Sequence, residues 1–401
     1  MADRPIESLG GRTPLEYAKT PKMDELAAKG EIGMVHTIPD GMKPGSDTAN
    51  LSVLGYNPRE FYSGRSPLEA LSIGVPMKDT DVALRCNIVT LSEEEDNYED
   101  RTIIDHSSGE ISTEECAVLL EAVKKELETD IFHFYVGTSY RHCLIWENGE
   151  VVDLVQPHDV LGQKIGDKLP ENEALRTMKL PEDQDLREMM KKSYDILVNH
   201  PINVERRKKG LHPANSCWFW GAGTKPALYP FTERTHKKGA MISAVDLLKG
   251  IAVGTSMKVI TVDGANGGLD TNYEGKANAA LDVLTKDGYD FVYVHLEGPD
   301  EMGHQGSVEK KVKAIERLDE RIIRPIAEGL AEAGEDFRMV VLPDHPTPIS
   351  LRTHTADNVP YLLYDSTAER SESWHYNERE AAQTANFIPE GHKLIEYLLQ
   401  M

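Results

Sequence analysis

Hydrophobic residues in the second half of the chain form short runs separated by longer helical patterns. Each run is rich in Val, Ile, Leu or aromatic residues and has the length of a buried strand. The predicted strands are 257–262, 291–297, 337–342 and 359–365. The helical patterns cover 242–254 and 273–288 and resume at Ser307, with Val308, Val312, Ile315, Leu318 and Ile322 on one face. This alternation predicts right-handed crossovers and a mostly parallel sheet covered on both faces.

The section 80–231 has a different pattern, which indicates an α+β unit with its own core. Its predicted elements are a strand at 81–91, an antiparallel pair at 131–136 and 142–146, a helix at 182–198 and an aromatic loop at 215–226. Ser112 and Glu115 form a capping box for a further helix, whose apolar face carries Val118, Leu119, Val123 and Leu127. The simplest architecture is a doubly wound α/β domain made of 1–79 and 232–401, interrupted by this unit.

Carboxylates and imidazoles follow two of the predicted strands. Asp300 and His304 come at i and i+4 after the strand 291–297, and Asp344, His345 and then His354 follow the strand 337–342. Ligands of open α/β sheets bind beyond the carboxyl ends of strands, so these side chains are candidate ligands of a divalent metal. The alternative for Asp300 is an acidic residue in the first turn of a capped helix.

Ser46 lies between Gly45 and Asp47 in a Gly/Pro loop, just before a run that can start a helix. Three imidazoles and two carboxylates exceed the needs of one tetrahedral site, and two metals would explain the surplus. Such a pair suits phosphoryl transfer with Ser46 as the nucleophile. Taken singly, a serine in a loop of this kind is more often structural, and a lone histidine is more often a surface or core residue than a ligand.

Composition narrows the choice of partners. The chain has 401 residues and a formal net charge of -23, from 44 Lys and Arg against 67 Asp and Glu. Nucleic acid and anionic membranes would be repelled, so an anionic substrate would need bound metal or a few arginines to attract it. Apolar runs stay short of the roughly 20 residues of a membrane span. The cysteines, Cys86, Cys116, Cys143 and Cys217, are widely spaced, as expected for reduced thiols of a cytoplasmic protein.

Several segments resemble one enzyme family across essentially the whole chain. They are PGSDTANLSVLGYNP, NYEGKANAALD, HLEGPDEMGHQG, PDHPTP and RTHTADNVP. The chain resembles the cofactor-independent phosphoglycerate mutases of the archaeal type, a branch of the alkaline phosphatase superfamily. The resemblance implies an alkaline-phosphatase-like sheet with an inserted substrate-gripping domain, and two divalent ions, manganese in preference to zinc or cobalt. It also implies interconversion of 3-phosphoglycerate and 2-phosphoglycerate without 2,3-bisphosphoglycerate.

The resemblance assigns roles to the candidate ligands. Asp300, His304 and His354 match the ligands of one metal. Ser46, Asp344 and His345 match those of the other, and Ser46 matches the residue that becomes phosphorylated. Family members have a further metal-binding Asp at the end of a first strand, upstream of the segment that here reads MADRP. We therefore expect this chain to lack that strand, to have unpaired sheet edges and weak stability, and to be impaired at the Ser46 metal.

A small phosphorylated carboxylate calls for cationic side chains, above all Arg. The candidates are Arg85, Asp105, His106, Arg141, His142, Lys225 and Lys276. The resemblance supports His106 and Arg141 most, and solvated surface charge is the alternative for each. The competing functions are another metal-dependent phosphatase or phosphotransferase of the superfamily, and a non-catalytic homologue. A homo-oligomer is compatible with the sequence.

Overall fold

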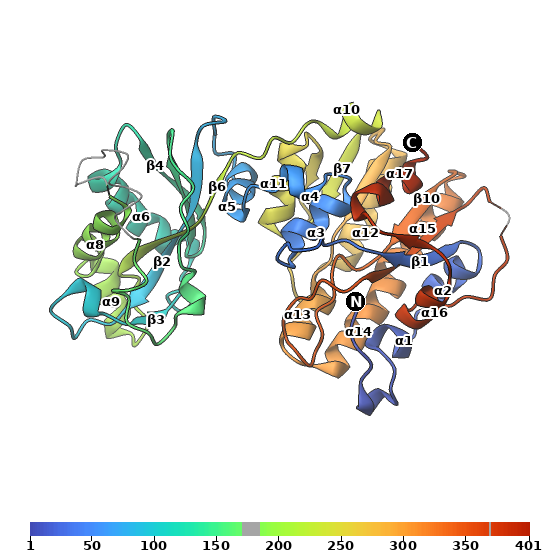
Figure 1. Cartoon of the computed structure of the whole chain (residues 1–401), viewed down its shortest axis with the longest axis horizontal. Coiled ribbons are helices and arrows are strands. Elements are labelled where there is room, and N and C mark those ends of the chain that lie inside the picture. The colour runs from blue at the N-terminus through green and yellow to red at the C-terminus, as the bar shows by residue number, and fades with distance from the viewer. Residues whose placement is uncertain (171–184, 369) are drawn as a thin grey trace. The chain divides into compact units, whose positions relative to one another are not determined.

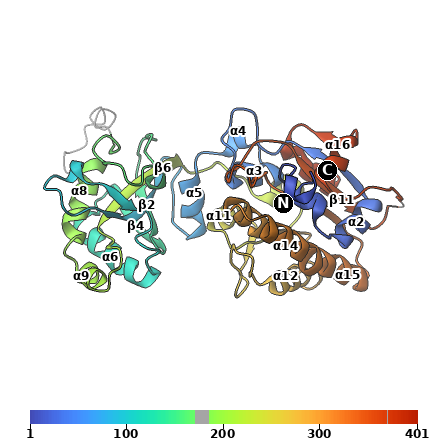
Figure 2. The ribbon, with the colours of Figure 1, turned by 90° about the horizontal axis from the view of Figure 1, so that it is seen from below.

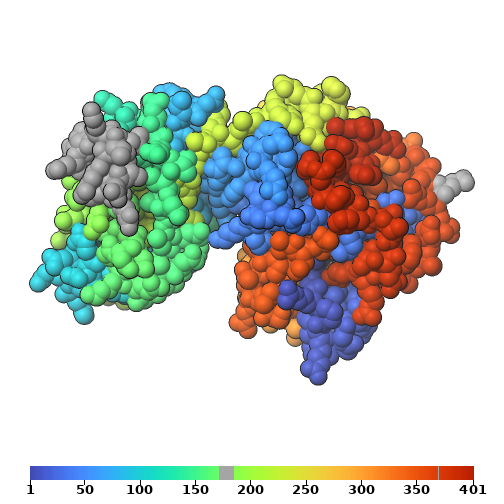
Figure 3. Space-filling model, in the orientation of Figure 1, coloured from blue at the N-terminus to red at the C-terminus, as the bar shows by residue number. Residues whose placement is uncertain are grey.

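The computed structural model describes residues 1–170, 185–368 and 370–401, and they form two compact units (Figure 1). The first consists of Met1–Tyr62 and Leu228–Met401, and the second of Ser63–Ala227. Within the first unit the two ends of the sequence are interleaved, because the first residues pack against elements from the last hundred (Figure 3). The predicted α/β class is confirmed. In the described residues no helix is long and apolar enough to cross a membrane.

The first unit contains two sheets. One has the order β10 (Arg338–Val341), β11 (Val359–Asp365), β1 (Glu31–Val35), β12 (Phe387–Ile388), and the other has the order β8 (Lys258–Ile260), β7 (Gly239–Ile242), β9 (Phe291–Val294). The second sheet is parallel, as the alternating pattern predicts. In the first sheet β11 runs antiparallel to both of its neighbours, which differs from the mostly parallel arrangement expected.

Helices cover both faces of these sheets. Those of the first unit are α1 (Pro14–Tyr17), α2 (Pro21–Ala28), α3 (Ser46–Val53), α4 (Pro58–Phe61), α10 (Phe231–Thr235), α11 (Asp246–Gly254), α12 (Tyr273–Thr285), α13 (Gly298–His304), α14 (Val308–Leu318), α15 (Arg324–Glu332), α16 (Glu378–Gln383) and α17 (Leu394–Leu399). A π-helical turn, η5 (Asp319–Ile323), joins α14 to α15, and together with α12 they lie side by side (Figure 2). Short 3₁₀ turns are η1 (Glu7–Leu9) and η6 (Gly391–Lys393).

Successive strand residues point into two different cores. In β9, Val292 and Val294 pack into the core under α12, α14 and α15, whereas Tyr293 packs into the core that includes Val53 of α3 and Leu394 of α17. In β10, Met339 packs into the first of these cores and Val340 into the second. This period of two shows that both sheets belong to one layer between two helical layers.

The layer is interrupted between β9 and β10. A slot of about 750 Å³ lies there, lined by both strands and by apolar side chains from η5, α15 and α17. Within the described residues, each of these strands pairs with a neighbour along one edge alone. At one end the slot reaches Asp300, Asp344 and His345. The candidate ligands therefore stand where the layer is interrupted.

The second unit is an α+β fold. Its elements are α5 (Arg65–Ser72), β2 (Val82–Leu91), η2 (Tyr98–Asp100), β3 (Ile103–Asp105), α6 (Thr113–Leu127), β4 (Phe132–Thr138), β5 (Arg141–Trp146), η3 (Pro157–Asp159), α8 (Leu186–Leu197), α9 (Pro201–Lys208) and β6 (Ser216–Thr224). Its sheet has the order β3-β2-β5-β4, with β6 also paired to β2. The predicted pairing of β4 with β5 and the capping of α6 by Ser112 are both present.

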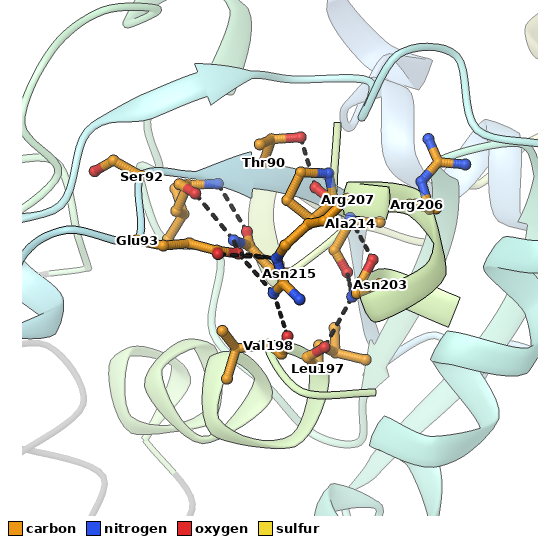
Figure 4. Close-up of polar contacts among 12 residues, drawn as sticks. Thr90, Ser92, Glu93, Leu197, Val198, Asn203, Arg206, Arg207, Ala214 and Asn215 are labelled. Carbon is orange, nitrogen blue, oxygen red and sulfur yellow. Dashed lines mark hydrogen bonds and ion pairs between the residues drawn. The ribbon is translucent and has the colours of Figure 1, made fainter. Parts of the chain in front are cut away.

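Polar side chains tie the α9–β6 connection to the rest of this unit (Figure 4). Asn215 exchanges two hydrogen bonds with the backbone of Leu91, at 2.8 and 2.9 Å. Asn203 does the same with Ala214 and also donates to the carbonyl oxygen of Leu197. These buried amides satisfy backbone groups on either side of the connection, so they help to fix where β6 begins.

Three local predictions were wrong, and each error has a physical cause. Residues 215–226 form the strand β6 rather than a loop, because Trp218 and Phe219 are buried in the core beside β2. The strand β7 was missed, since its four residues run directly into the helical pattern, and α11 begins at Asp246 instead of at 242. Val118 is 52% exposed, and Leu120 takes its place in the core. The predicted helix 182–198 is observed as α8, and residues 182–184 lie outside the described ranges.

Asp319 fixes the beginning of α2 across the core. Its carboxylate accepts the backbone N–H groups of Lys22 and Met23, at 3.1 and 2.6 Å, whereas the N-cap residue Thr20 offers no side-chain hydrogen bond. Asp319→Ala should lower the free energy of unfolding by about 1–3 kcal/mol, because it leaves these buried donors unpaired. Urea denaturation measures the loss, with Glu320→Ala, at the exposed neighbour, as the control. Equal stability of the two variants would contradict this role.

Candidate metal centre

The first part of the centre is built on α13, directly after β9. Pro299 near the start of this helix suits its first turn, and its seven residues place Asp300 and His304 one turn apart on the same face. Asp300 Oδ2 lies 3.3 Å from His304 Nε2. A ligand pair is thus produced by local helical geometry alone.

His354 joins this pair from the segment between β10 and β11. Its Nε2 atom lies 2.9 Å from His304 Nε2 and 3.5 Å from Asp300 Oδ1. Ligand atoms of the three residues lie within 4.8 Å of one another. One carboxylate and two imidazole nitrogens converging in this way fit a divalent transition-metal ion, and they leave coordination positions for a substrate.

The second part joins α3 to the segment after β10. Ser46 is the first residue of α3, and its Oγ lies 3.0 Å from His345 Nε2, which is 3.4 Å from Asp344 Oδ2. Asn50, one turn along α3, donates to the Ser46 carbonyl oxygen at 2.7 Å and to Asp344 Oδ2 at 2.9 Å. The two parts are adjacent, because the rings of His345 and His354 have centroids 4.0 Å apart.

The ionisation states are set by burial and by the pairing of opposite charges. Burial disfavours the charged form of Asp300, but hydrogen bonds from His304 and His354 outweigh it and hold the pKa of Asp300 below its usual range. The hydrogen bond to Asp300 raises the pKa of His304 to about 9. Burial also opposes ionisation of Asp344, yet His345 keeps the pKa of that carboxyl lowered. The centre thus holds ionised carboxylates that a cation would stabilise.

Lys276 lies on α12 in the same unit. Its Nζ donates to the carbonyl oxygen of His295 at 3.1 Å, and burial lowers its pKa. His295 Nδ1 lies 3.2 Å from Ser243 Oγ, and burial lowers the pKa of this imidazole to about 4. Burial, with repulsion from Glu301 and Asp300, raises the pKa of Glu297 to about 7. Sequence reasoning missed His295 and Glu297, although both stand in the segment HLEGPDEMGHQG.

In the second unit, Asp105 is the last residue of β3 and His106 follows it. Burial opposes ionisation of Asp105, but hydrogen bonds from Ser107, His212 and Gly109 lower its pKa to about 2. The His106 ring meets those of Tyr140 and His158 edge to face, and its buried Nδ1 has no hydrogen-bond partner among the described residues. Asp105 therefore organises its own loop, and His106 retains a free nitrogen.

The neighbours Arg141 and His142 on β5 point in opposite directions. The Arg141 side chain is exposed and lies over the Tyr140 ring at 5.5 Å. His142 is buried, accepts the Gly137 N–H at 3.0 Å and contacts Cys116 Sγ at 3.1 Å, and burial lowers its pKa to about 4. His142 is accordingly placed as a core residue.

The other two cationic candidates have acidic partners. Arg85 is buried between Glu69, at 2.7 Å, and the face of Trp220. Lys225 lies 3.4 Å from Asp79. A nearby carboxylate therefore neutralises the positive charge of each side chain.

Comparison with known proteins identifies the family. A family model described as 2,3-bisphosphoglycerate-independent phosphoglycerate mutase matches residues 27–203. A protein of that name from Methanosarcina barkeri is 48% identical over 385 residues, which are 96% of this chain and 92% of the relative. A probable 2,3-bisphosphoglycerate-independent phosphoglycerate mutase from Geobacter sulfurreducens is 45% identical over 401 residues, 100% of this chain and 97% of the relative. The chain belongs to this family. The resemblance inferred from sequence is thereby confirmed.

Solved structures agree with this membership. The PH0037 protein from Pyrococcus horikoshii matches with a TM-score of 0.80 and 31% identity, over 100% of this chain and 94% of that one. A cofactor-independent phosphoglycerate mutase from Thermoplasma acidophilum matches with a TM-score of 0.63 and 24% identity, over 100% and 96%, and shows the shared fold. The predicted alkaline-phosphatase-like architecture with an insertion is thus the fold of the family.

Glu297 should make the stability of the metal-free chain depend on pH. A folded-state pKa of about 7, above the unfolded value of 4.5, means that the folded chain holds the proton more tightly. The free energy of unfolding should therefore decline as pH rises from about 4.5 through 7, and Glu297→Gln should reduce that decline. Urea denaturation with a chelator at pH 5 and pH 8 measures it, with the exposed Glu309→Gln as the control. Identical pH dependence in wild type and Glu297→Gln would refute the assignment.

Proposed function

We propose that the chain interconverts 3-phosphoglycerate and 2-phosphoglycerate without 2,3-bisphosphoglycerate, as an isomerase of the intramolecular phosphotransferase class. The observation that carries this proposal is the position of Ser46. Its Oγ lies 3.0 Å from His345 Nε2, beside a second group made of Asp300, His304 and His354. Family membership supplies the substrate, a small phosphorylated carboxylate.

Two divalent ions, manganese in preference to zinc or cobalt, fit the residues present. Asp300, His304 and His354 would hold one, and Ser46, Asp344 and His345 the other. When bound, such ions lower the pKa of a coordinated hydroxyl and stabilise charge on a transferring phosphoryl group. The donor set supports this assignment, because partly buried, ionised carboxylates face imidazole nitrogens at both positions.

Ser46 carries the phosphoryl group between the two oxygens of glycerate. Its Oγ loses its proton and bonds to phosphorus while the bond between phosphorus and the 3-oxygen breaks, and the departing 3-oxygen gains a proton. The 2-hydroxyl of the retained glycerate then loses its proton and bonds to phosphorus while the bond between phosphorus and Ser46 Oγ breaks, and Oγ regains a proton. Exclusion of water during this interval makes the chain a mutase rather than a hydrolase.

Residues 80–231 form the substrate-gripping domain in this proposal, and residues 1–79 with 232–401 form the metal-binding domain. Arg141 offers an exposed guanidinium to the substrate anion, and His106 has a ring nitrogen, Nδ1, that is buried and lacks a hydrogen-bond partner among the described residues. Asp105 holds the loop that carries His106. Lys276, on the metal-binding domain, is a further candidate for binding the substrate anion. The cysteines Cys86, Cys116, Cys143 and Cys217 are free and buried, which supports a cytoplasmic location.

Ser46→Ala tests the nucleophile. Mutase activity with Mn²⁺ and no 2,3-bisphosphoglycerate should fall by at least about a thousandfold, because the group that accepts the phosphoryl is gone. Ser371→Ala, at an exposed position, should retain wild-type activity. Residual turnover of Ser46→Ala near the wild-type rate would refute the phosphoserine route. Hydrolysis of 3-phosphoglycerate by the wild type without isomerisation would indicate a phosphatase instead.

Arg141→Lys tests the substrate grip. A lysine keeps the charge but loses bidentate pairing with a carboxylate or phosphate, so KM for 3-phosphoglycerate should rise by about tenfold or more. Steady-state kinetics measure the change. Arg187→Lys on α8, whose guanidinium pairs with Glu99 at 3.6 Å, is the matched control. An unchanged KM would exclude Arg141 from the substrate site.

A further inference from the structure

Thr347 lies between the two groups of candidate ligands. It follows β10 in the segment that carries Asp344 and His345, and it is 2% exposed. Its hydroxyl oxygen is within hydrogen-bond distance of Asp300 Oδ1 and lies 3.4 Å from His345 Nδ1. One side chain thus touches a candidate ligand from each group.

The hydrogen atoms available decide the direction of these contacts. An ionised carboxylate only accepts, so the single hydroxyl hydrogen of Thr347 is donated to Asp300. The contact with His345 then requires the ring to donate from Nδ1 to the Thr347 oxygen. With its hydrogen on Nδ1, the ring presents the lone pair of Nε2, the atom that faces Ser46.

A buried lysine holds Thr347 in place. Lys311 on α14 is fully buried, and its ammonium donates to the Thr347 carbonyl oxygen at 2.8 Å, to Asp3 Oδ2 at 2.8 Å and to the Ala2 carbonyl oxygen at 3.2 Å. All three of its N–H bonds are therefore used. Asp3 also accepts the Ile349 N–H, at 3.2 Å from Oδ2. The Lys311–Asp3 pair thus holds the segment at Thr347 and at Ile349.

The other side of the segment is fixed by close packing. A Cβ atom on Gly303 would lie 2.6 Å from the Thr347 carbonyl oxygen, so α13 approaches the segment at a distance that only glycine allows. Gly303 stands directly before His304 on this helix. The position of Thr347 is thereby linked to that of α13, which carries Asp300 and His304.

We propose that Thr347 is a positioning residue of the metal centre, which orients Asp300 through its donated hydroxyl and His345 through its accepting oxygen, and which the Lys311–Asp3 pair holds in register. The proposal rests on the proposed metal-dependent function. In this proposal Thr347 acts through these two ligands and does not itself hold the metal. Groups that hydrogen-bond to metal ligands in this way commonly govern affinity by about 10–100-fold.

Thr347→Val and Thr347→Ser form the matched pair that tests it. Valine keeps the shape and removes the hydroxyl, whereas serine keeps the hydroxyl and removes a methyl group. Mn²⁺ binding to the full chain is measured by the electron paramagnetic resonance signal of free Mn²⁺. Thr347→Val should bind Mn²⁺ about 10–100-fold more weakly, and Thr347→Ser should bind with nearly wild-type affinity. Circular dichroism and thermal unfolding establish that both variants are folded.

The double variant Asp3→Asn with Lys311→Met provides a second arm. It removes both buried charges and the tether to the Thr347 carbonyl but leaves the hydroxyl in place, so Mn²⁺ binding should again weaken. Equal affinity in wild type and Thr347→Val would overturn the proposal. Equal weakening by valine and serine would also overturn it, because packing would then be the cause. Absence of Mn²⁺ binding by the wild type would instead refute the proposed metal centre, and the role of Thr347 with it.

Discussion

Two ionised carboxylates, Asp300 and Asp344, lie partly buried in the same site, in the segments that follow β9 and β10. Burying such charges is costly unless cations and hydrogen bonds offset the loss of water. Polar contacts of the site offset this cost. His304 and His354 face Asp300, while His345 and Asn50 face Asp344. In the protein alone, compensation at Asp300 depends on the protonated ring of His304, and divalent ions would offset the charge more fully at both carboxylates while freeing the rings to act as ligands.

The same site occupies an interruption in the sheet layer. The strands β9 and β10 deliver its ligands, and each has an edge that faces the slot instead of a neighbouring strand. Polar side chains connect the segments around this slot. The Lys311–Asp3 pair, Thr347 and the Tyr293 hydroxyl, which donates to Asn50 at 2.6 Å, connect the two sides. Positional precision in the site thus depends on buried polar contacts, which are sensitive to the loss of one partner.

Sequence patterns predicted the parts of the site that arise from local geometry. Asp300 and His304 are one helical turn apart, and Asp344 and His345 directly follow a strand, so both pairs were recognisable without a structure. The meeting of His354 with His304, 50 residues away, is a property of the fold. Contacts such as Lys311 with Asp3, separated by 308 residues, leave no periodic signal. The four-residue strand β7 and the strand β6, rich in Trp, Phe and Gly, were missed because their patterns did not separate strand from helix or loop.

The residues Arg141 and His142 show why a charged motif does not by itself identify a substrate site. Successive residues of a strand face opposite sides, so one of the two was bound to be buried when β5 formed. The buried one satisfies both ring nitrogens inside the core and stays neutral. Arg85 is neutralised by Glu69, and Arg206 by Glu115. In a chain of net charge -23, the proposed binding of a phosphorylated carboxylate would therefore depend on a few exposed cations such as Arg141, together with the charge of the proposed metal ions.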